Sequence, residues 1–114
     1  MTVREIVEKL DLEVLTGDAG LDREITGGYA SDLLSDVLAH GQSGDAWVTL
    51  QTHSNVIAIA SLKDIPAVVL VNGRRPDAET LGKAREEGVV LLGTPLPAFE
   101  LAGRLYQMGL RGRR

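Results

Sequence analysis

The sequence predicts a small α/β domain with a mainly parallel sheet and flanking helices. Two unbroken apolar runs, Pro66–Val71 and Val89–Leu92, are typical of strands covered on both faces. Segments with helical patterning alternate with the predicted strands, which requires crossover connections between parallel strands. The chain has 114 residues. That length suits a single domain and buries roughly two-thirds of the unfolded surface.

The chain is expected to open with a short amphipathic helix. Thr2 and Glu5 have the spacing of a capping box, in which each satisfies a backbone N–H of the other. The apolar residues that follow recur at helical spacing: Val3, Ile6, Val7 and Leu10. Leu12–Leu15 alternates in polarity and is partly β-branched, which predicts a short strand after the helix.

A polar stretch then runs through a glycine pair into a second predicted helix. Ile25–Tyr29 is expected to form a short extended piece, and Ser31–His40 to form the helix. Ser31 or Asp32 is a natural N-cap, and Gly41 a plausible stop. The apolar stripe of this helix is Leu33, Leu34, Val37 and Leu38.

Strands and helices alternate through the rest of the chain. Ala46–Leu50 is predicted to be a strand. Asn55–Leu62 has no polar face, so its alanines favour a buried helix, although periodicity does not exclude a strand. Asp77 is expected to cap a helix that ends at Glu87. A last helix follows Pro97 and is expected to place four residues on one side: Phe99, Ala102, Leu105 and Tyr106.

Composition narrows the possible functions. The absence of cysteine excludes disulfides, thiolate metal sites and cysteine nucleophiles, and it fits a cytoplasmic protein. A net charge of −4 and an aromatic content of 4% argue against nucleic-acid binding. No apolar run approaches ~18 residues, so no membrane span or signal peptide is expected. Residues 1–110 are predicted to form the domain, and residues 111–114 a solvated basic tail.

The candidate site is the edge of the sheet at which the parallel strands end. Ligands of open parallel sheets bind outside the carboxyl ends of the strands, and polar residues are expected to reach this edge from four segments. The candidate ligand-binding residues are Thr26, Gly27, Gly28, Ser31 and Asp32, then Thr52, His53 and Asn55, then Asn72, Gly73, Arg74 and Arg75, and finally Thr94. Together they predict a polar crevice.

Each candidate also has a purely structural interpretation. The pair Gly27–Gly28, feeding a helix N-terminus, holds an anion or simply makes a tight turn. His53 is a general base or a helix cap, and it lacks a second histidine or cysteine at ligand spacing, so no metal site is expected. Arg74–Arg75 binds a phosphate or carboxylate, or is solvated. Asp32 and Asp36 hold a cation, or one caps the helix and the other is exposed. No catalytic motif and no phosphate-binding P-loop occurs.

Four segments of the chain form a specific combination: Thr26–Val37, Thr49–Val56, Asn72–Pro76 and Ala98–Tyr106. They resemble the DRTGG domain family, and the resemblance covers nearly the whole chain. Members of the family also occur attached to phosphotransacetylases and to CBS-domain proteins, including some pyrophosphatases. The family is similar to the N-terminal domain of HPr kinase/phosphorylase, whose kinase activity resides in a separate P-loop domain. The resemblance implies a stand-alone regulatory or assembly module that forms dimers.

The chain departs from the family pattern at the motif that names it. The family motif is contiguous, whereas here Glu24–Ile25 separates Asp22–Arg23 from Thr26–Gly28. Alignment on the glycines puts Glu24 and Ile25 where the family has aspartate and arginine. The role of that acid–base pair is therefore not carried over to this chain.

Three functions remain open from the sequence. The first is a non-catalytic regulatory domain that dimerises and binds a small phosphate-like or nucleotide-like anion, with no cofactor and with a metabolic enzyme or CBS-domain protein as partner. The second is a protein–protein assembly module without a ligand, in which the polar residues only cap helices. The third is a small enzyme that uses His53 together with Asp32 or Asn55.

Overall fold

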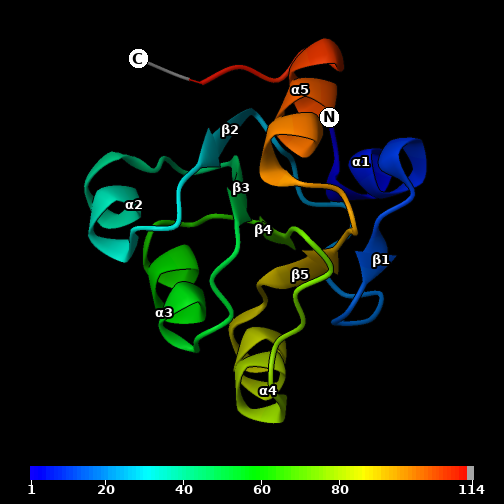
Figure 1. Cartoon of the computed structure of the whole chain (residues 1–114). Coiled ribbons are helices and arrows are strands. Elements are labelled where there is room, and N and C mark those ends of the chain that lie inside the picture. Colours follow the sequence, from blue (N-terminus) through cyan, green and yellow to red (C-terminus); the bar gives the residue numbers. More distant parts are fainter. Residues whose placement is uncertain (113–114) are drawn as a thin grey trace.

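The computed structural model describes residues 1–112. Strands and helices alternate along this part of the chain (Figure 1). The order is α1 (Val3–Leu10), β1 (Glu13–Val14), β2 (Gly27–Ala30), α2 (Leu34–His40), β3 (Asp45–Thr49), α3 (Asn55–Leu62), β4 (Ala67–Leu70), α4 (Ala78–Glu87), β5 (Val90–Gly93) and α5 (Ala98–Gln107). The predicted α/β class is confirmed, and Asn55–Leu62 is a helix.

The strands form one sheet in the order β1-β5-β4-β3-β2. Strands β2 to β5 are parallel, with Tyr29 beside Trp47 and Trp47 beside Val68 in the register. The short β1 closes the far edge and runs antiparallel to β5, with Glu13 opposite Gly93. From β2 to β5, each strand is added on the same side of the one before it.

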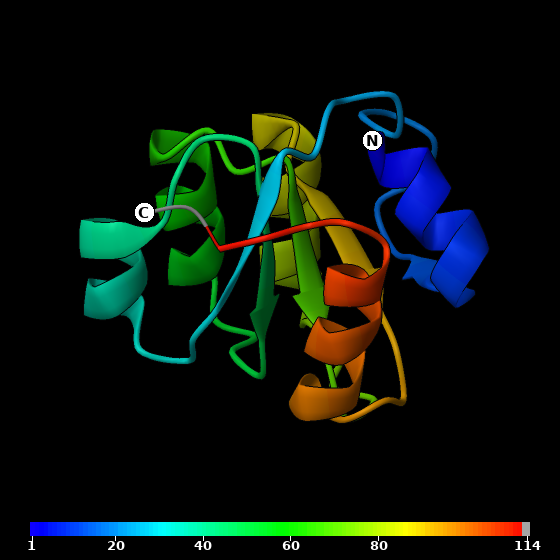
Figure 2. The same ribbon diagram turned by 90° about the horizontal axis from the view of Figure 1, so that it is seen from above.

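Helices cover both faces of the sheet (Figure 2). The connecting helices α2, α3 and α4 lie on one face, over a core that includes Trp47, Ile57 and Leu91. Helices α1 and α5 lie on the other face, over a core that includes Ile6 and Leu101. The central strands β3 and β4 are buried along their whole length. This explains why Pro66–Val71 reads as an unbroken apolar run.

Local signals in the sequence account for two of the helix starts. In α1, the Thr2 hydroxyl accepts the Glu5 amide and the Glu5 carboxylate accepts the Thr2 amide, which completes the predicted capping box. In α4, the Asp77 carboxylate accepts the Thr80 amide at 2.8 Å. Both caps are confirmed. No helix within residues 1–112 combines the length and apolar character that a membrane crossing requires.

The start of α2 differs from its prediction. The extended piece predicted at Ile25–Tyr29 is confirmed as strand β2, so Gly27–Gly28 does not form a turn. Helix α2 begins only at Leu34, not at Ser31. The N-cap residue is Leu33, which makes no side-chain capping bond. Neither Ser31 nor Asp32 caps the helix, because both follow the end of β2 and their side chains bond elsewhere. Of the predicted apolar stripe, only Val37 is fully buried, while Leu33 and Leu38 are exposed.

The buried face of α5 also differs from its prediction. Leu101 and Leu105 pack into the core, whereas Phe99 and Tyr106 are exposed. Two rows of apolar residues run along this helix at similar spacing. The row with the two leucines faces the sheet, and the two aromatic residues remain on the surface.

Candidate functional site

The fold brings most of the predicted site residues to one edge of the sheet. The following residues come after the carboxyl ends of the parallel strands: Ser31, Asp32, Thr52, His53, Asn55, Asn72, Gly73, Arg74, Arg75 and Thr94. Thr26 and Gly27 lie instead at the amino end of β2, where the Thr26 amide donates to the Gly44 carbonyl at 2.9 Å. Gly28 follows within the strand. The expectation that Thr26, Gly27 and Gly28 share the carboxyl edge is therefore wrong.

Asp32 ties the carboxyl ends of two strands together. One of its carboxylate oxygens accepts the Thr49 hydroxyl at 2.9 Å and the Leu50 amide at 2.7 Å. The Gln51 side-chain amide donates to the Asp32 carbonyl at 3.1 Å. Asp32 thus holds the chain after β2 against the end of β3, and its carboxylate is already engaged. Asp36 lies in α2, and its carboxylate accepts the Tyr29 hydroxyl at 2.8 Å. Asp32 lies before the helix, so the two carboxylates do not share a helix face as a cation site.

His53 precedes the N-cap residue of α3, which is Ser54, and bonds the first residue of the helix. Its Nδ1 accepts the Asn55 amide at 3.0 Å, so this nitrogen is not available as a base while that bond is formed. The side chain is exposed, with only Nε2 open to a ligand. In the part of the chain that the structure describes, no three histidine, cysteine, aspartate or glutamate side chains gather as a metal site.

Asp77 links this edge to the start of α4. The Thr80 amide donates to the Asp77 carboxylate and lowers its pKa, and the nearby Thr80 side chain and His53 add smaller lowerings. The Asp77 carboxylate is the N-cap of α4, so its ionised form stabilises the folded chain.

Acid titration is expected to expose this contribution. Because the folded pKa of Asp77 lies below its ordinary value of 3.8, the stabilisation is complete above about that pH and is lost as the pH falls through the folded pKa. Urea unfolding measured between pH 6 and pH 2.5 should show this loss. Asp77→Asn keeps a capping oxygen without the charge. It should therefore flatten the acid dependence, and an unchanged dependence would contradict the assignment.

The backbone amides of the turn after β4 are hydrogen-bonded to carbonyls of the chain itself. Asn72 and Gly73 both have positive φ, and their amides donate to the Leu96 and Thr94 carbonyls, each at 2.9 Å. The Thr94 hydroxyl accepts the Leu96 amide at 3.2 Å. This turn therefore anchors the loop after β5, and its two amides do not form an open anion-binding nest.

The side chains of the adjacent Arg74 and Arg75 differ in their interactions. Arg75 makes a two-pronged ion pair with Glu13 of β1, with N–O distances of 2.8 and 3.1 Å. The hydrogen bonds of the pair lower the pKa of Glu13 and raise that of Arg75. Both side chains are more than half exposed, so the pair adds little stability. No hydrogen bond or ion pair to the Arg74 side chain occurs within residues 1–112.

Arg74 lies at a recess of about 250 Å³ beside the ends of β4 and β5. The recess is lined by Asp11, Glu13, Gly73, Arg74, Arg75, Gly93, Thr94 and Pro95. Four of the predicted site residues therefore meet here. Asp32, Thr52, His53 and Asn55 follow other strands and do not line this recess.

The strand order explains why the predicted crevice is reduced to a recess. In doubly wound sheets, the crevice forms where the strand order reverses and the loops on either side diverge. From β2 to β5 this sheet adds strands in one direction, so it has no such reversal. The recess forms beside the antiparallel β1. Two of its lining residues, Asp11 at the end of α1 and Glu13 of β1, were not indicated by the sequence as part of a site.

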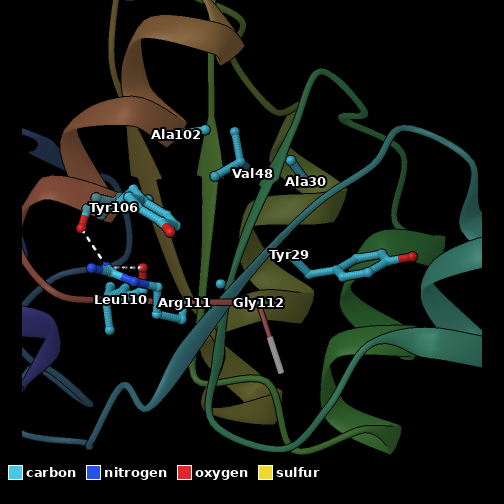
Figure 3. A pocket seen from close by; sticks show the side chains of 10 residues that line it. Tyr29, Ala30, Val48, Ala102, Tyr106, Leu110, Arg111 and Gly112 are labelled. Atoms are coloured by element: carbon cyan, nitrogen blue, oxygen red, sulfur yellow. Dashed lines mark hydrogen bonds between the residues drawn. The ribbon is translucent and has the colours of Figure 1, made fainter. Parts of the chain in front are cut away.

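A second cavity, of about 130 Å³, is apolar and lies on the α5 face beside β2 (Figure 3). The segment after α5 crosses it, and the Gly28 amide donates to the Arg111 carbonyl at 3.2 Å. The Arg111 guanidinium lies 3.8 Å from the centre of the Tyr106 ring and bonds the Tyr106 carbonyl. Arg111 is exposed but held in place, which differs from a frayed tail. The predicted tail residues Arg113 and Arg114 lie outside the described residues.

The displaced pair Asp22–Arg23 has structural roles near the amino edge of the sheet. Asp22 accepts the Arg4 side chain at 3.0 Å. Arg23 bonds Asp64 at 2.9 Å and the Gly88 carbonyl at 2.9 Å, so it joins the loops before β2, β4 and β5. Ile25 is buried in the core. Neither Asp22 nor Arg23 lies at the carboxyl edge.

Comparison with solved structures found a similar fold in a regulatory protein. The crystal structure is that of the CBS and DRTGG domains of the regulatory region of Clostridium perfringens pyrophosphatase, complexed with the activator diadenosine tetraphosphate. The TM-score is 0.69 at 12% sequence identity, over 90% of this chain. This chain spans only 44% of that one. The similarity is consistent with a DRTGG-like fold.

Sequence comparisons gave no further relatives. No family model matches the sequence. The search of curated proteins found no significant match. The structural similarity therefore establishes the fold, and the function has to be argued from the chain's own residues.

Proposed function

We propose that this chain is a non-catalytic regulatory domain of the cytoplasm that dimerises and binds a small phosphate-like or nucleotide-like anion in the recess at Arg74. Its partner is a metabolic enzyme or a CBS-domain protein whose activity the ligand controls. The observation that carries the ligand part is the Arg74 guanidinium, which no described residue engages, at the rim of a polar recess.

The chemistry of the recess supports an anionic ligand. A guanidinium donates two parallel hydrogen bonds to a phosphate. The Thr94 hydroxyl accepts the Leu96 amide, which leaves its own hydrogen free to donate. Gly73 leaves the approach open, since nothing lies within 4 Å of the position that a Cβ would occupy. Asp11 and Glu13 also line the recess, and Arg75 offsets the Glu13 charge by its ion pair, so the anion is expected on the Arg74 side.

The similar solved structure supports the regulatory part. That regulatory region was crystallised with a nucleotide activator. A nucleotide carries the phosphate oxygens that Arg74 would bind. Nucleotides are therefore the first ligands to test.

Thermal unfolding with a ligand panel tests this proposal. ATP, AMP, diadenosine tetraphosphate and pyrophosphate are each added to the purified chain. A ligand at 100 times its dissociation constant stabilises the fold by about 2.7 kcal/mol, which raises the midpoint by roughly 10 °C. Arg74→Ala should remove most of this shift. Lys83→Ala, an exposed residue of α4 with the same change in charge, should leave it intact.

Two outcomes would contradict the ligand part. In one, no member of the panel moves the midpoint of the unaltered chain. In the other, the shift is the same for Arg74→Ala as for Lys83→Ala. Isothermal titration with the best ligand then gives the affinity directly.

A second candidate is an assembly module without a ligand. It is favoured by the fact that most polar groups at the carboxyl edge bond within the chain, as the contacts of Asp32, His53 and Arg75 illustrate. The aromatic side chains on α5 provide a surface for such an assembly. A small enzyme based on His53 has less support, because its Nδ1 is occupied by the Asn55 amide.

A further inference from the structure

Helix α5 exposes a row of residues that do not pack into the core. Phe99 is 92% exposed and Tyr106 is 57% exposed. Residues at i, i+4 and i+7 share one face of a helix, so Gly103 lies between the two aromatic residues on that outer face. Phe99, Gly103 and Tyr106 are referred to here as the aromatic stripe.

Packing within residues 1–112 does not require a glycine at position 103. A glycine in a helix interior costs roughly 0.5–1 kcal/mol relative to alanine. No described atom lies within 4 Å of the position that a Cβ at Gly103 would occupy, so no neighbour in the chain requires a glycine there. A glycine on an outer helix face allows a second helix to approach closely, which would account for the residue.

The order of residues along α5 is nearly symmetric about its middle. Phe99 and Tyr106 lie equally far from the midpoint between Ala102 and Gly103. If a second α5 runs antiparallel across that midpoint, the Phe99 of each copy meets the Tyr106 of the other. The small residues Ala102 and Gly103 then lie at the crossing. A surface that fits itself in this way is what a twofold dimer requires.

The charged side chains beside the aromatic stripe are also complementary between two antiparallel copies of α5. Glu100 and Arg104 lie on one flank of α5 and form an ion pair of 3.0 Å within the helix. A twofold axis perpendicular to the helix places the Glu100–Arg104 flanks of the two copies side by side. It also makes the two helices run in opposite directions. Glu100 of one copy therefore comes opposite Arg104 of the other, and no like charges are brought together.

We propose that α5 packs antiparallel against α5 of a second copy of this chain, with the twofold axis close to Gly103. The inference rests on the dimer part of the proposed function and names its interface. Arg111, stacked on the Tyr106 ring, holds one of the aromatic side chains in position. A helix of ten residues is only ~15 Å long, so the contact is smaller than a standard interface and the dimer should depend on concentration.

Sedimentation equilibrium over a range of concentrations is the first test. The unaltered chain should show a reversible monomer–dimer equilibrium. Phe99→Ser should raise the dissociation constant at least tenfold, because a few buried aromatic residues carry most of the affinity of an interface. Leu62→Ser removes an apolar side chain that is 74% exposed on α3 and should leave the equilibrium unchanged. Circular dichroism checks that both variants remain folded.

Cross-linking locates the interface independently. Because the chain has no cysteine, a single introduced thiol reports only its own surroundings. Gly103→Cys should give a covalent dimer on oxidation or with a short bis-maleimide linker. Lys83→Cys, on the opposite helical layer, should remain monomeric under the same treatment.

The outcomes separate this inference from the broader proposal. A chain that stays monomeric at all concentrations overturns both the dimer and its interface, while the ligand test at Arg74 stands apart. A dimer that Phe99→Ser does not weaken, and that Gly103→Cys does not trap, overturns only the α5 interface. A dimer that Phe99→Ser weakens and Gly103→Cys traps supports both.

Discussion

Replacing Trp47 with alanine is expected to lower the free energy of unfolding by about 3–5 kcal/mol. Trp47 is fully buried in β3 and packs beneath the layer formed by α2, α3 and α4. Its indole N–H donates to the Ser31 carbonyl at 2.8 Å, so the side chain also holds the chain where β2 ends. Small domains are stable by only about 5–15 kcal/mol, so this loss is a large fraction of the total.

Urea unfolding followed by circular dichroism measures this loss, because Trp47 is the only tryptophan and its fluorescence disappears with it. Trp47→Phe keeps an aromatic ring but lacks the indole N–H. It should therefore cost less than Trp47→Ala, with part of its loss arising from the unpaired Ser31 carbonyl. A loss below about 1.5 kcal/mol for Trp47→Ala would contradict the packing described here.

Replacing Gly44 with alanine is expected to cost at least about 2 kcal/mol. Gly44 precedes β3 with φ of +86°, a conformation that residues with a Cβ rarely adopt. A Cβ at this position would also collide with the Thr26 hydroxyl oxygen. The Gly44 carbonyl accepts the Thr26 amide, so relieving the collision would disturb the pairing of β2 with β3.

Gly73→Ala is the matched control for this substitution. Gly73 also has a positive φ, of +68°, but nothing lies within 4 Å of its Cβ position, so the control reports backbone strain without collision. A double substitution, Thr26→Ala with Gly44→Ala, should recover part of the difference because it removes the colliding oxygen. Equal losses for Gly44→Ala and Gly73→Ala would show that the collision does not contribute.

The sequence predicted best those features that local chemistry determines. The Thr2–Glu5 capping box and the Asp77 cap each depend on residues within one turn of the chain, and both are confirmed. The apolar run Pro66–Val71 predicted a buried strand because central parallel strands have no polar face. These signals, repeated along the chain, were sufficient for the α/β class.

Features that depend on distant residues were less predictable. Whether Gly27–Gly28 forms a turn or a strand depends on pairing with β3, and nothing within the stretch itself specifies that pairing. The buried side of α5 depends on which of two apolar stripes meets the sheet. The helical spacing of Phe99 and Tyr106 could not distinguish that stripe from the one containing Leu101.

The candidate site was predicted in part for the same reason. Polar residues after β4 and β5 do meet, since the carboxyl ends of parallel strands share an edge. The partners of individual side chains could not be predicted, because they come from far along the chain. Asp32 bonds Thr49, and Arg75 bonds Glu13 from a strand 62 residues earlier. These partners leave Arg74 as the arginine of the recess.

The two edges of the sheet affect how copies of this protein can associate. A long unpaired edge strand pairs with strands of other molecules and leads to fibrils. Here β1 is only two residues long, with the charged pair Glu13–Arg75 beside it. At the other edge, the Gly28 amide is taken by the Arg111 carbonyl. Strand-to-strand association is therefore disfavoured at both edges of the sheet.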